Sequence, residues 1–380
     1  MGVSLPGQGP GGRAGLSATR PIRPVEPNGR LPVGTRRAPG TGTSQGFPGA
    51  VRPCQGRGRP TPVPRIVSPG ELSPSLFLVG AFMKKTLLVF AALMAMGAAQ
   101  AQSDTLKKIK DSASVTMGVR ESSGALSLTL GDGKYVGYHV ELCQRALADV
   151  QKLLGLPKLD IKYQAVTSQN RIPLVQNGTV DIECGSTTNN AARQKDVSFA
   201  VTTYVEEVRI AVKGSSGITS IAQLGGKSVA TTTGTTSVQL LRKHERANGV
   251  NFNEVFGKDH ADSFLLLESG RADAFVMDGQ ILAGNIAKSK APADFKIVGE
   301  VLSVEPIAIM MRKDDPAFKK AIDASLTAMM KSGEIAKIYD KWFMQPIPPS
   351  NTRVGLPVSD ATKAAWTNPN DKPAEDYAKK

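Results

Sequence analysis

Hydroxyl, amide and guanidinium side chains follow one another closely in the segment DIECGSTTNNAARQKDV, residues 181–197. Its alternating apolar residues stop at Gly185, and Ser186 and Thr188 then precede Arg193. Hydroxyl and backbone N–H groups at the start of a helix donate hydrogen bonds, and a guanidinium is a planar donor that matches a carboxylate. The segment therefore predicts a place where an anionic group binds.

Other polar residues stand where further strands are expected to end. Arg120 closes the apolar segment SVTMGVR, and Ser168 and Arg171 follow KYQAV. Arg120 could instead be a solvated surface arginine, and Ser168 could cap the helix that begins near Arg171. A cation in the first turn of a helix opposes the helix dipole, so Arg171 at that position favours a functional role. Thr235 and Thr236 follow SVAT, where they would cap a helix or, with its free N–H groups, hold an anion.

A carboxylate and a histidine complete the candidates. Asp278 follows the apolar run FVM, and a buried carboxylate requires a partner. That partner would be a structural cation or the ammonium group of a ligand. His260, in KDHADSF, is otherwise a cap at the start of a helix or a surface group. The sequence has no P-loop, dinucleotide fingerprint or G-x-S-x-G motif, and its three histidines are too far apart in the chain to indicate a metal site.

These residues need a scaffold that brings several strand ends together. Strand and helix patterns alternate, which predicts an α/β fold with covered parallel sheets. The pattern restarts after a strand at residues 208–213, and residues 305–313 indicate a strand that returns to the first part. We therefore expect two α/β lobes joined by a two-segment hinge: lobe 1 at 102–212, lobe 2 at 213–304, a return to lobe 1 at 305–346 and a polar tail at 347–380. Ligands of such sheets bind beyond the carboxyl ends of the strands, so all the candidates would point into one cleft.

The first 101 residues differ from the rest. Residues 1–82 contain 16 Gly and 14 Pro without apolar periodicity, which predicts a disordered leader; a basic arm for nucleic acid is the alternative. Residues 83–101, MKKTLLVFAALMAMGAAQA, have the lysines, apolar stretch and A-x-A site of a secretory signal peptide. We expect Met83 to be the true start and Gln102 to be the first residue of a mature periplasmic protein.

Removal of the first 101 residues changes the charge and the set of cysteines. The whole chain has 47 basic and 33 acidic residues, and removing the 12 basic and 2 acidic residues before Gln102 lowers the net charge from +14 to +4. That charge gives no reason to expect nucleic acid or membrane binding. Cys143 and Cys184 remain, and in an oxidising compartment they could form a disulfide or stay as buried free thiols.

Several motifs together resemble one known family. TSQNRIPLVQNGTVDIECGSTTNN, TTGTTS, KDHADSFLLLESGRADAFVMD and KWFMQPIPPSN resemble the periplasmic glutamate/aspartate-binding proteins of ABC transporters, which belong to the extracellular solute-binding proteins for polar amino acids. The resemblance runs from about Leu106 to Asn370. It implies a two-lobed periplasmic-binding-protein fold of type II, L-glutamate or L-aspartate as ligand, an inner-membrane permease as partner, a monomer, and no cofactor or metal.

The resemblance also assigns a role to each candidate residue. Those implied for the α-carboxylate of the ligand are Thr188, Arg193 and Thr236. Those implied for its ammonium group are Asp278 and Ser186. Those implied for its side-chain carboxylate are Arg120, Ser168, Arg171 and His260. The segment RESSGALS lacks the aromatic pair that many relatives have there, so the contacts with the aliphatic part of the ligand stay open.

Two other classes of protein fit parts of the sequence. An enzyme on the same scaffold, such as a periplasmic dehydratase or a lytic enzyme, needs an acid with a raised pKa near the ligand. Glu183 is the nearest acid, but strand alternation turns it away from the side of Cys184, and no second acid is evident. A chemoreceptor or regulator needs a membrane span or a DNA-binding domain, and neither is recognisable. The sequence therefore favours a binding protein.

Overall fold

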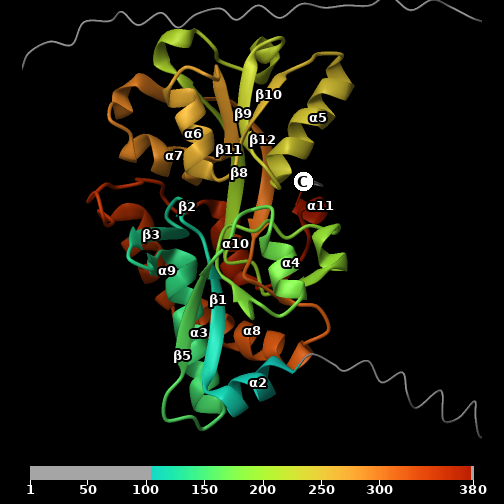
Figure 1. The fold of residues 1–380 in the computed structure, drawn as a ribbon, viewed down its shortest axis with the longest axis vertical. Helices are drawn as coiled ribbons and strands as arrows, with labels where there is room; N and C mark the ends of the chain where they lie inside the picture. Colours follow the sequence, from blue (N-terminus) through green and yellow to red (C-terminus); the bar gives the residue numbers. More distant parts are fainter. Residues whose placement is uncertain (1–103, 378–380) are drawn as a thin grey trace, which may run out of the picture. The chain divides into compact units, whose positions relative to one another are not determined.

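The structure is a computed structural model that describes residues 104–377. The expected leader at residues 1–82 and the expected signal peptide at residues 83–101 lie outside these residues. None of the helices within 104–377 is long and apolar enough to cross a membrane. This part of the chain forms two five-stranded sheets and one three-stranded sheet, with helices packed beside them (Figure 1).

The first sheet has a parallel centre. Its strand order is β5 (Asp160–Ala165), β1 (Ser114–Val119), β6 (Ile182–Glu183), β13 (Met310–Arg312) and β7 (Val197–Phe199). β1 is parallel to β5 and β6, whereas β13 is antiparallel to β6 and β7. Its helices are α2 (Thr105–Ser112), α3 (Tyr138–Leu153), α4 (Arg171–Gln176), α8 (Pro316–Lys331) and α9 (Glu334–Tyr339). We call this sheet and its helices lobe 1.

The second sheet mixes parallel and antiparallel pairs. Its strand order is β10 (Asn253–Gly257), β9 (Ser228–Thr232), β11 (Ala274–Asp278), β8 (Tyr204–Lys213) and β12 (Phe295–Ile307). β9 is parallel to β10 and β11, while β8 is antiparallel to β11 and β12. Beside it lie α5 (Thr236–Asn248), α6 (His260–Glu268) and α7 (Gly279–Lys288) (Figure 1). We call this sheet and its helices lobe 2. The predicted α/β class is therefore confirmed.

Smaller elements complete the described chain. A three-stranded sheet consists of β2 (Ser122–Ser123), β3 (Ser127–Gly131) and β4 (Lys134–Val136). Single turns of other helix types are η1 (Arg193–Lys195), η2 (Gly214–Ser216), η3 (Ile221–Leu224), η4 (Pro292–Asp294) and η5 (Asp340–Met344). The tail holds α10 (Asp360–Thr367) and α11 (Ala374–Tyr377). Ala365 of α10 is buried, and Thr362 Oγ1 accepts a hydrogen bond from the Val205 N–H at 3.0 Å. The tail therefore packs against the fold, although most of its residues are polar.

The chain changes lobes at points other than those predicted. β8 begins at Tyr204 in the second sheet, so residues 204–212, predicted for lobe 1, belong to lobe 2. β12 extends to Ile307 before β13 enters lobe 1, so the return begins later than predicted. β8 and β12 pair from Tyr204 with Ile307 to Lys213 with Phe295. An apolar strand pattern cannot reveal which sheet the strand will join, and this long pairing decides it.

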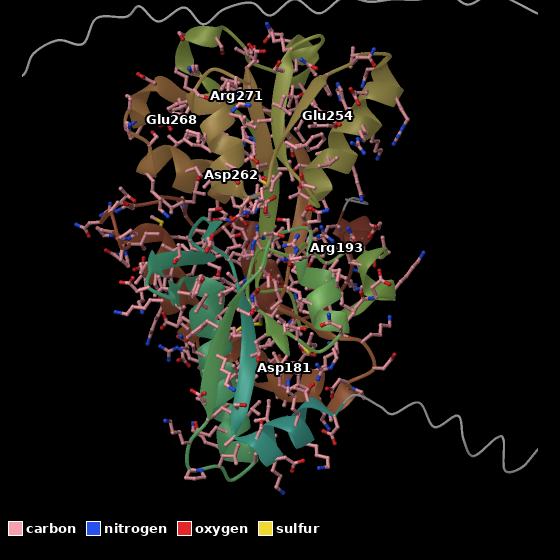
Figure 2. The ribbon with its side chains drawn as sticks, in the orientation of Figure 1. Asp181, Arg193, Glu254, Asp262, Glu268 and Arg271 are labelled. Carbon is pink, nitrogen blue, oxygen red and sulfur yellow. A yellow bond between two sulfur atoms is a disulfide. The ribbon has the colours of Figure 1, made fainter. Side chains whose placement is uncertain are left out.

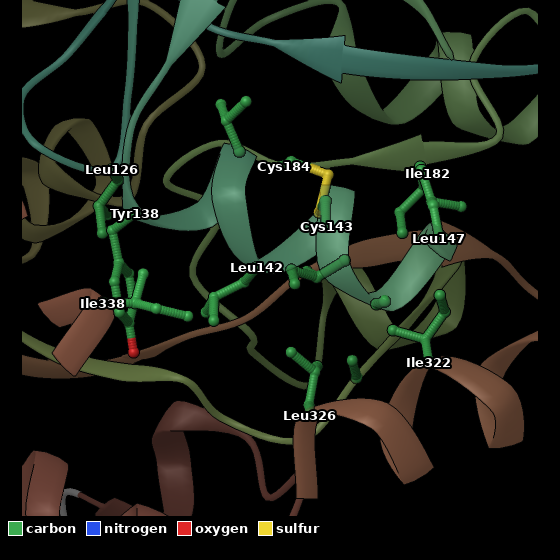
Figure 3. Packing of buried hydrophobic residues seen from close by; sticks show 14 of the residues in the cluster. Leu126, Tyr138, Leu142, Cys143, Leu147, Ile182, Cys184, Ile322, Leu326 and Ile338 are labelled. Atoms are coloured by element: carbon green, nitrogen blue, oxygen red, sulfur yellow. A yellow bond between two sulfur atoms is a disulfide. The ribbon is translucent and has the colours of Figure 1, made fainter. Parts of the chain in front are cut away.

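A disulfide joins Cys143 and Cys184 within the apolar core of lobe 1 (Figure 3). The sequence left this pairing open. The two Cα atoms are 6.4 Å apart, which is within the range that a disulfide spans. The bond ties α3 to the chain just after β6, where the loop that carries Ser186 and Thr188 begins.

We expect the double variant Cys143→Ala/Cys184→Ala to lose about 4 kcal/mol of unfolding free energy, because the bond closes a loop with a sequence separation of 41. Urea unfolding of the wild type with and without a reductant would measure this loss. The variant is the matched control, since a reductant should leave its midpoint unchanged. Equal stability of the oxidised and reduced wild type would contradict a stabilising bond.

Candidate binding site

The nine candidate residues lie at the ends of strands and the starts of helices. Seven of them are buried, and Arg193 and Thr236 are half-buried. Those in lobe 1 are Arg120 after β1, Ser168 before α4, Arg171 at the start of α4, Ser186 and Thr188 after β6, and Arg193 in η1. Those in lobe 2 are Thr236 at the start of α5, His260 at the start of α6, and Asp278 at the end of β11.

Polar contacts link several of these residues across the two lobes. Arg120 Nη2 lies 3.2 Å from His260 Nε2. Arg193 Nη1 donates to the carbonyl oxygen of Thr188 at 2.9 Å, and its Nη2 donates to that of Gly234 in lobe 2 at 3.3 Å. Figure 2 shows Arg193 at this junction. The strand ends of both lobes therefore meet at one place.

Gly234 allows the two lobes to approach closely. Its φ of +82° favours glycine, and an added Cβ would lie 2.8 Å from Gln169 Cα and 2.9 Å from the carbonyl carbon of Ser168. The segment before α5 therefore packs directly against the loop that carries Ser168. Any side chain at Gly234 would push these two segments apart.

Two buried guanidinium groups have donors without acceptors. Arg120 is 0% exposed and Arg171 is 2% exposed, and within residues 104–377 the Nε and Nη1 atoms of both have no hydrogen-bond partner. Burial, together with the positive charges of Arg193 and Arg120, lowers the pKa of Arg171 to about 9, although the charge of Glu183 opposes the shift. Buried donors without acceptors raise the free energy of the protein, and an anionic oxygen would offset that cost. The unpartnered donors of these two side chains are therefore suited to an anion.

Buried carboxylates of Asp278 and Glu305 lie near the arginines, and the buried carboxylate of Glu206 lies near these two acids. Burial raises the pKa of Asp278 to about 7, and the charge of Glu305 adds to the rise while the nearby arginines oppose it. Burial, and then the charge of Asp278, raises the pKa of Glu206 well above its ordinary value. A cationic group beside Asp278 would favour its ionised form. Among the residues that the structure describes, no three His, Cys, Asp or Glu side chains are grouped to hold a metal ion.

Three acids of the site are not among the candidates from the sequence: Glu206, Asp259 and Glu305. Glu305 Oε2 accepts hydrogen bonds from Thr188 Oγ1 at 2.6 Å and from Thr236 Oγ1 at 2.8 Å, so one carboxylate joins candidates from both lobes. Glu305 and Glu206 are register partners in β12 and β8. The signal that could have found them is an acid inside an apolar strand, in SVEPIAI and in TYVEEVRI.

The structure decides one alternative and places one further acid. Asn170, not Ser168, occupies the N-cap position of α4. Glu183, which the sequence placed on the side opposite Cys184, is fully buried; its Oε2 accepts a hydrogen bond from Thr187 Oγ1 at 2.6 Å, and its charge acts on the pKa of Arg171. β6 has only two residues, so strand alternation gives no guide to the side chains around it.

The alternative roles of three other residues are also decided. Arg120 and His260 are buried, so neither is a surface group. Thr235 is the N-cap of α5, but its hydroxyl donates to the carbonyl oxygen of Thr232 at 2.7 Å and accepts nothing from the helix. The first N–H groups of α5 have no acceptor within their own helix. They therefore remain donors for another acceptor.

His139 holds the loop after β6 in place. Its Nδ1 lies 2.5 Å from the carbonyl oxygen of Gly185, and its Nε2 lies 2.7 Å from Thr203 Oγ1. A carbonyl oxygen only accepts, so Nδ1 carries the proton. Burial lowers the pKa of His139 to about 4, so the ring is neutral near pH 7. Together with the disulfide, His139 fixes the beginning of the segment that holds Ser186 and Thr188.

The chain is similar in sequence to known proteins over most of its described residues. Residues 115–345 match the family of bacterial extracellular solute-binding proteins, family 3. The L-glutamate/L-aspartate-binding protein of Pseudomonas aeruginosa is 46% identical over 306 residues, which cover 80% of this chain and 99% of that protein. The glutamate/aspartate import solute-binding protein of Escherichia coli is 46% identical over 275 residues, which cover 72% of this chain and 91% of that protein. Both names describe binding proteins rather than enzymes.

Solved structures with the same arrangement of elements are also amino-acid-binding proteins. A mutant of ArgBP from T. maritima has a TM-score of 0.56 and 26% identity, covering 63% of this chain and 99% of that one. An ancestral arginine-binding protein bound to arginine has a TM-score of 0.54 and 30% identity, covering 61% and 98%. The predicted two-lobed fold is confirmed by these similarities.

We expect Asp278→Asn to stabilise the protein at pH 8 by roughly 1–3 kcal/mol. The pKa of Asp278 rises from 3.8 to about 7 on folding. Between these values the folded state binds more protons than the unfolded chain, so the unfolding free energy of the wild type falls as pH rises. The advantage of the variant should therefore shrink as pH falls toward 4.

Urea unfolding at several pH values would measure this difference. Asp262→Asn is the matched control, because Asp262 is exposed on α6 (Figure 2). A variant that is less stable than the wild type at pH 8 would show that the Asp278 carboxylate is a net stabilising partner of the arginines.

Proposed function

Because this chain belongs to the bacterial extracellular solute-binding proteins, family 3, we propose that it is the substrate-binding component of an ABC importer and binds L-glutamate and L-aspartate. The ligand would lie among the buried side chains where the two lobes meet. One observation carries this proposal: Arg120 and Arg171 are buried, and their Nε and Nη1 atoms have no partner in the described part of the chain. Two such cations call for a carboxylate beyond the one that every amino acid has.

We assign the side-chain carboxylate of the ligand to Arg120 and Arg171, with Ser168 beside them. A hydrogen bond between charged groups contributes about 1.5–3 kcal/mol. The buried Ser168 hydroxyl likewise has no partner within residues 104–377, so it can add a donor. The side-chain amide of glutamine has no negative charge to pair with Arg120 and Arg171. Glutamate would therefore be preferred to glutamine.

We assign the α-carboxylate to Arg193 and to the backbone N–H groups at Thr188 and Thr236. The hydroxyl of each threonine has one proton, and both protons are donated to Glu305. The backbone N–H groups are therefore the better donors, and the start of the 13-residue helix α5 also has a favourable dipole for an anion.

We assign the ammonium group of the ligand to Asp278, with Ser186 beside it. Burial and the charge of Glu305 raise the pKa of Asp278 to about 7. A bound cation would lower that pKa and keep the carboxylate ionised. Ser186 Oγ lies 3.0 Å from Ser123 Oγ, which leaves it able to accept from an ammonium proton. The site would thus pair each charge of an acidic amino acid with an opposite charge.

We further propose that the protein acts in the periplasm as a monomer that docks transiently on an inner-membrane permease. The signal-peptide pattern at residues 83–101 supports its export. The name of the Escherichia coli relative, an import solute-binding protein, supports the partnership with a permease.

We expect isothermal calorimetry of the purified protein to show L-glutamate and L-aspartate bound with micromolar affinity or better, about 8 kcal/mol. L-Glutamine should bind at least ~30-fold more weakly, because its neutral amide gives no charged acceptor to the unpartnered donors of Arg120 and Arg171. L-Arginine serves as a control for a ligand of the wrong charge. Equal affinities for glutamate and glutamine would rule out the assignment of the side-chain carboxylate.

We expect Arg171→Met to weaken L-glutamate binding by ~30-fold or more and L-glutamine binding by less than ~5-fold, because one charged hydrogen-bond donor is lost. Methionine retains an unbranched apolar chain in the buried space. Arg246→Met, at an exposed position of α5, is the matched control and should bind both ligands like the wild type. An equal loss of affinity for both ligands would show that Arg171 does not act on the side-chain carboxylate of the ligand.

A further inference from the structure

We propose that Asp259 is a positioning residue that holds Arg120 from the opposite lobe and so couples closure of the lobes to formation of the subsite for the side-chain carboxylate. This inference rests on the proposed function, and it names a residue outside the nine candidates. Asp259 belongs to lobe 2 as the N-cap of α6, and Arg120 follows β1 in lobe 1.

The two lobes share a closed set of hydrogen bonds around Asp259. Its Oδ1 accepts from Arg120 Nη2 at 2.5 Å, and its Oδ2 accepts from Ser122 Oγ at 2.7 Å. Ser122 Oγ in turn accepts from the backbone N–H of Ala261 at 3.1 Å. Both carboxylate oxygens of Asp259 therefore bind the segment that follows β1 of lobe 1, and the first turn of α6 binds the same serine. None of these contacts can form while the lobes are apart.

Asp259 and His260 together use one nitrogen of the guanidinium. Arg120 Nη2 has two protons; one is directed to Asp259 and the other to His260 Nε2, 3.2 Å away. The protons on Nε and Nη1 remain, and no acceptor for them lies in the described part of the chain. Asp259 thus decides how Arg120 is oriented and which of its donors are left for a ligand.

His260 is oriented for the same purpose. Its Nδ1 lies 3.0 Å from Thr232 Oγ1, and an arginine can only donate, so Nε2 accepts and Nδ1 carries the proton. Burial lowers the pKa of His260 to about 3, and the charge of Arg120 also lowers it, so the ring is neutral near pH 7. Burial would raise the pKa of Asp259, but the charge of Arg120 and the hydrogen bond from Ser122 lower it to about 2. Asp259 therefore stays ionised wherever the protein is folded and in use.

The chain offers a matched pair of variants for the test. Asp259→Asn and Asp262→Asn each remove one negative charge from the start of α6, so their effects on the helix dipole are alike. Asp259 makes no side-chain capping bond to the helix, and asparagine is an equally good N-cap residue. Asp262 is exposed on the same helix (Figure 2). Of these two acids, only Asp259 contacts Arg120.

We expect Asp259→Asn to weaken L-glutamate binding by about tenfold, mainly through faster dissociation in stopped-flow measurements, because the contact stabilises the closed arrangement that holds the ligand. L-Glutamine should lose less than threefold, since Arg120 is assigned to the side-chain carboxylate. Ser122→Ala, which keeps the charge of Asp259 but removes one of its donors, should give a smaller loss in the same direction. Asp262→Asn should stay within twofold of the wild type for both ligands.

Two outcomes would overturn the inference: equal losses for glutamate and glutamine, or equal behaviour of the two asparagine variants. A readout without ligand separates it from the proposed function. The NMR signal of the Arg120 Nε–H group should shift in Asp259→Asn and remain in place in Asp262→Asn. If the wild type shows no preference for glutamate, the proposed function fails, and this signal still decides whether Asp259 orients Arg120.

Discussion

The incomplete pairing of buried charges where the two lobes meet is the constraint on which the rest of the structure depends. Arg120 and Arg171 are buried with unpartnered donors, and Asp278 is buried beside the like charge of Glu305. Burying such groups is unfavourable unless each finds an opposite charge or a full set of hydrogen bonds. The remainder of the fold must therefore supply the stability that this junction lacks, and it must hold the charges at fixed positions.

The fold meets both needs by keeping its apolar packing inside each lobe. The largest core cluster contains β1, α3 and α8 of lobe 1, and two separate clusters pack the two faces of the second sheet in lobe 2. The Cys143–Cys184 bond and His139 then fix the loop after β6 to this core. Each strand end is thus attached to a rigid body, and the polar junction needs no core of its own.

The sequence predicted the α/β class and the two lobes, because strand and helix periodicities are local features, and the resemblance of its motifs to a known family implied the nine candidate residues. It could not predict the pairing of β8 with β12, which depends on contacts between residues about a hundred positions apart. It also missed Asp259 and Glu305, which bind Arg120 and Thr188 of the other lobe. The absence of a second acid near Glu183 was an argument against an enzyme, and the buried acids remove that argument. The names of the relatives, which describe binding proteins, now favour a binding protein over an enzyme.

The two connections between the lobes are not independent. β8 and β12 are hydrogen-bonded side by side, and the bonding continues through the crossing, where the Ala200 N–H donates to the Ile309 carbonyl at 2.9 Å and the Thr203 N–H donates to the Ile307 carbonyl at 3.2 Å. Two separate tethers would permit twisting and sliding. We expect a bonded ribbon to favour bending about one axis, so that Asp259 and Arg120 would separate and meet again along a single path.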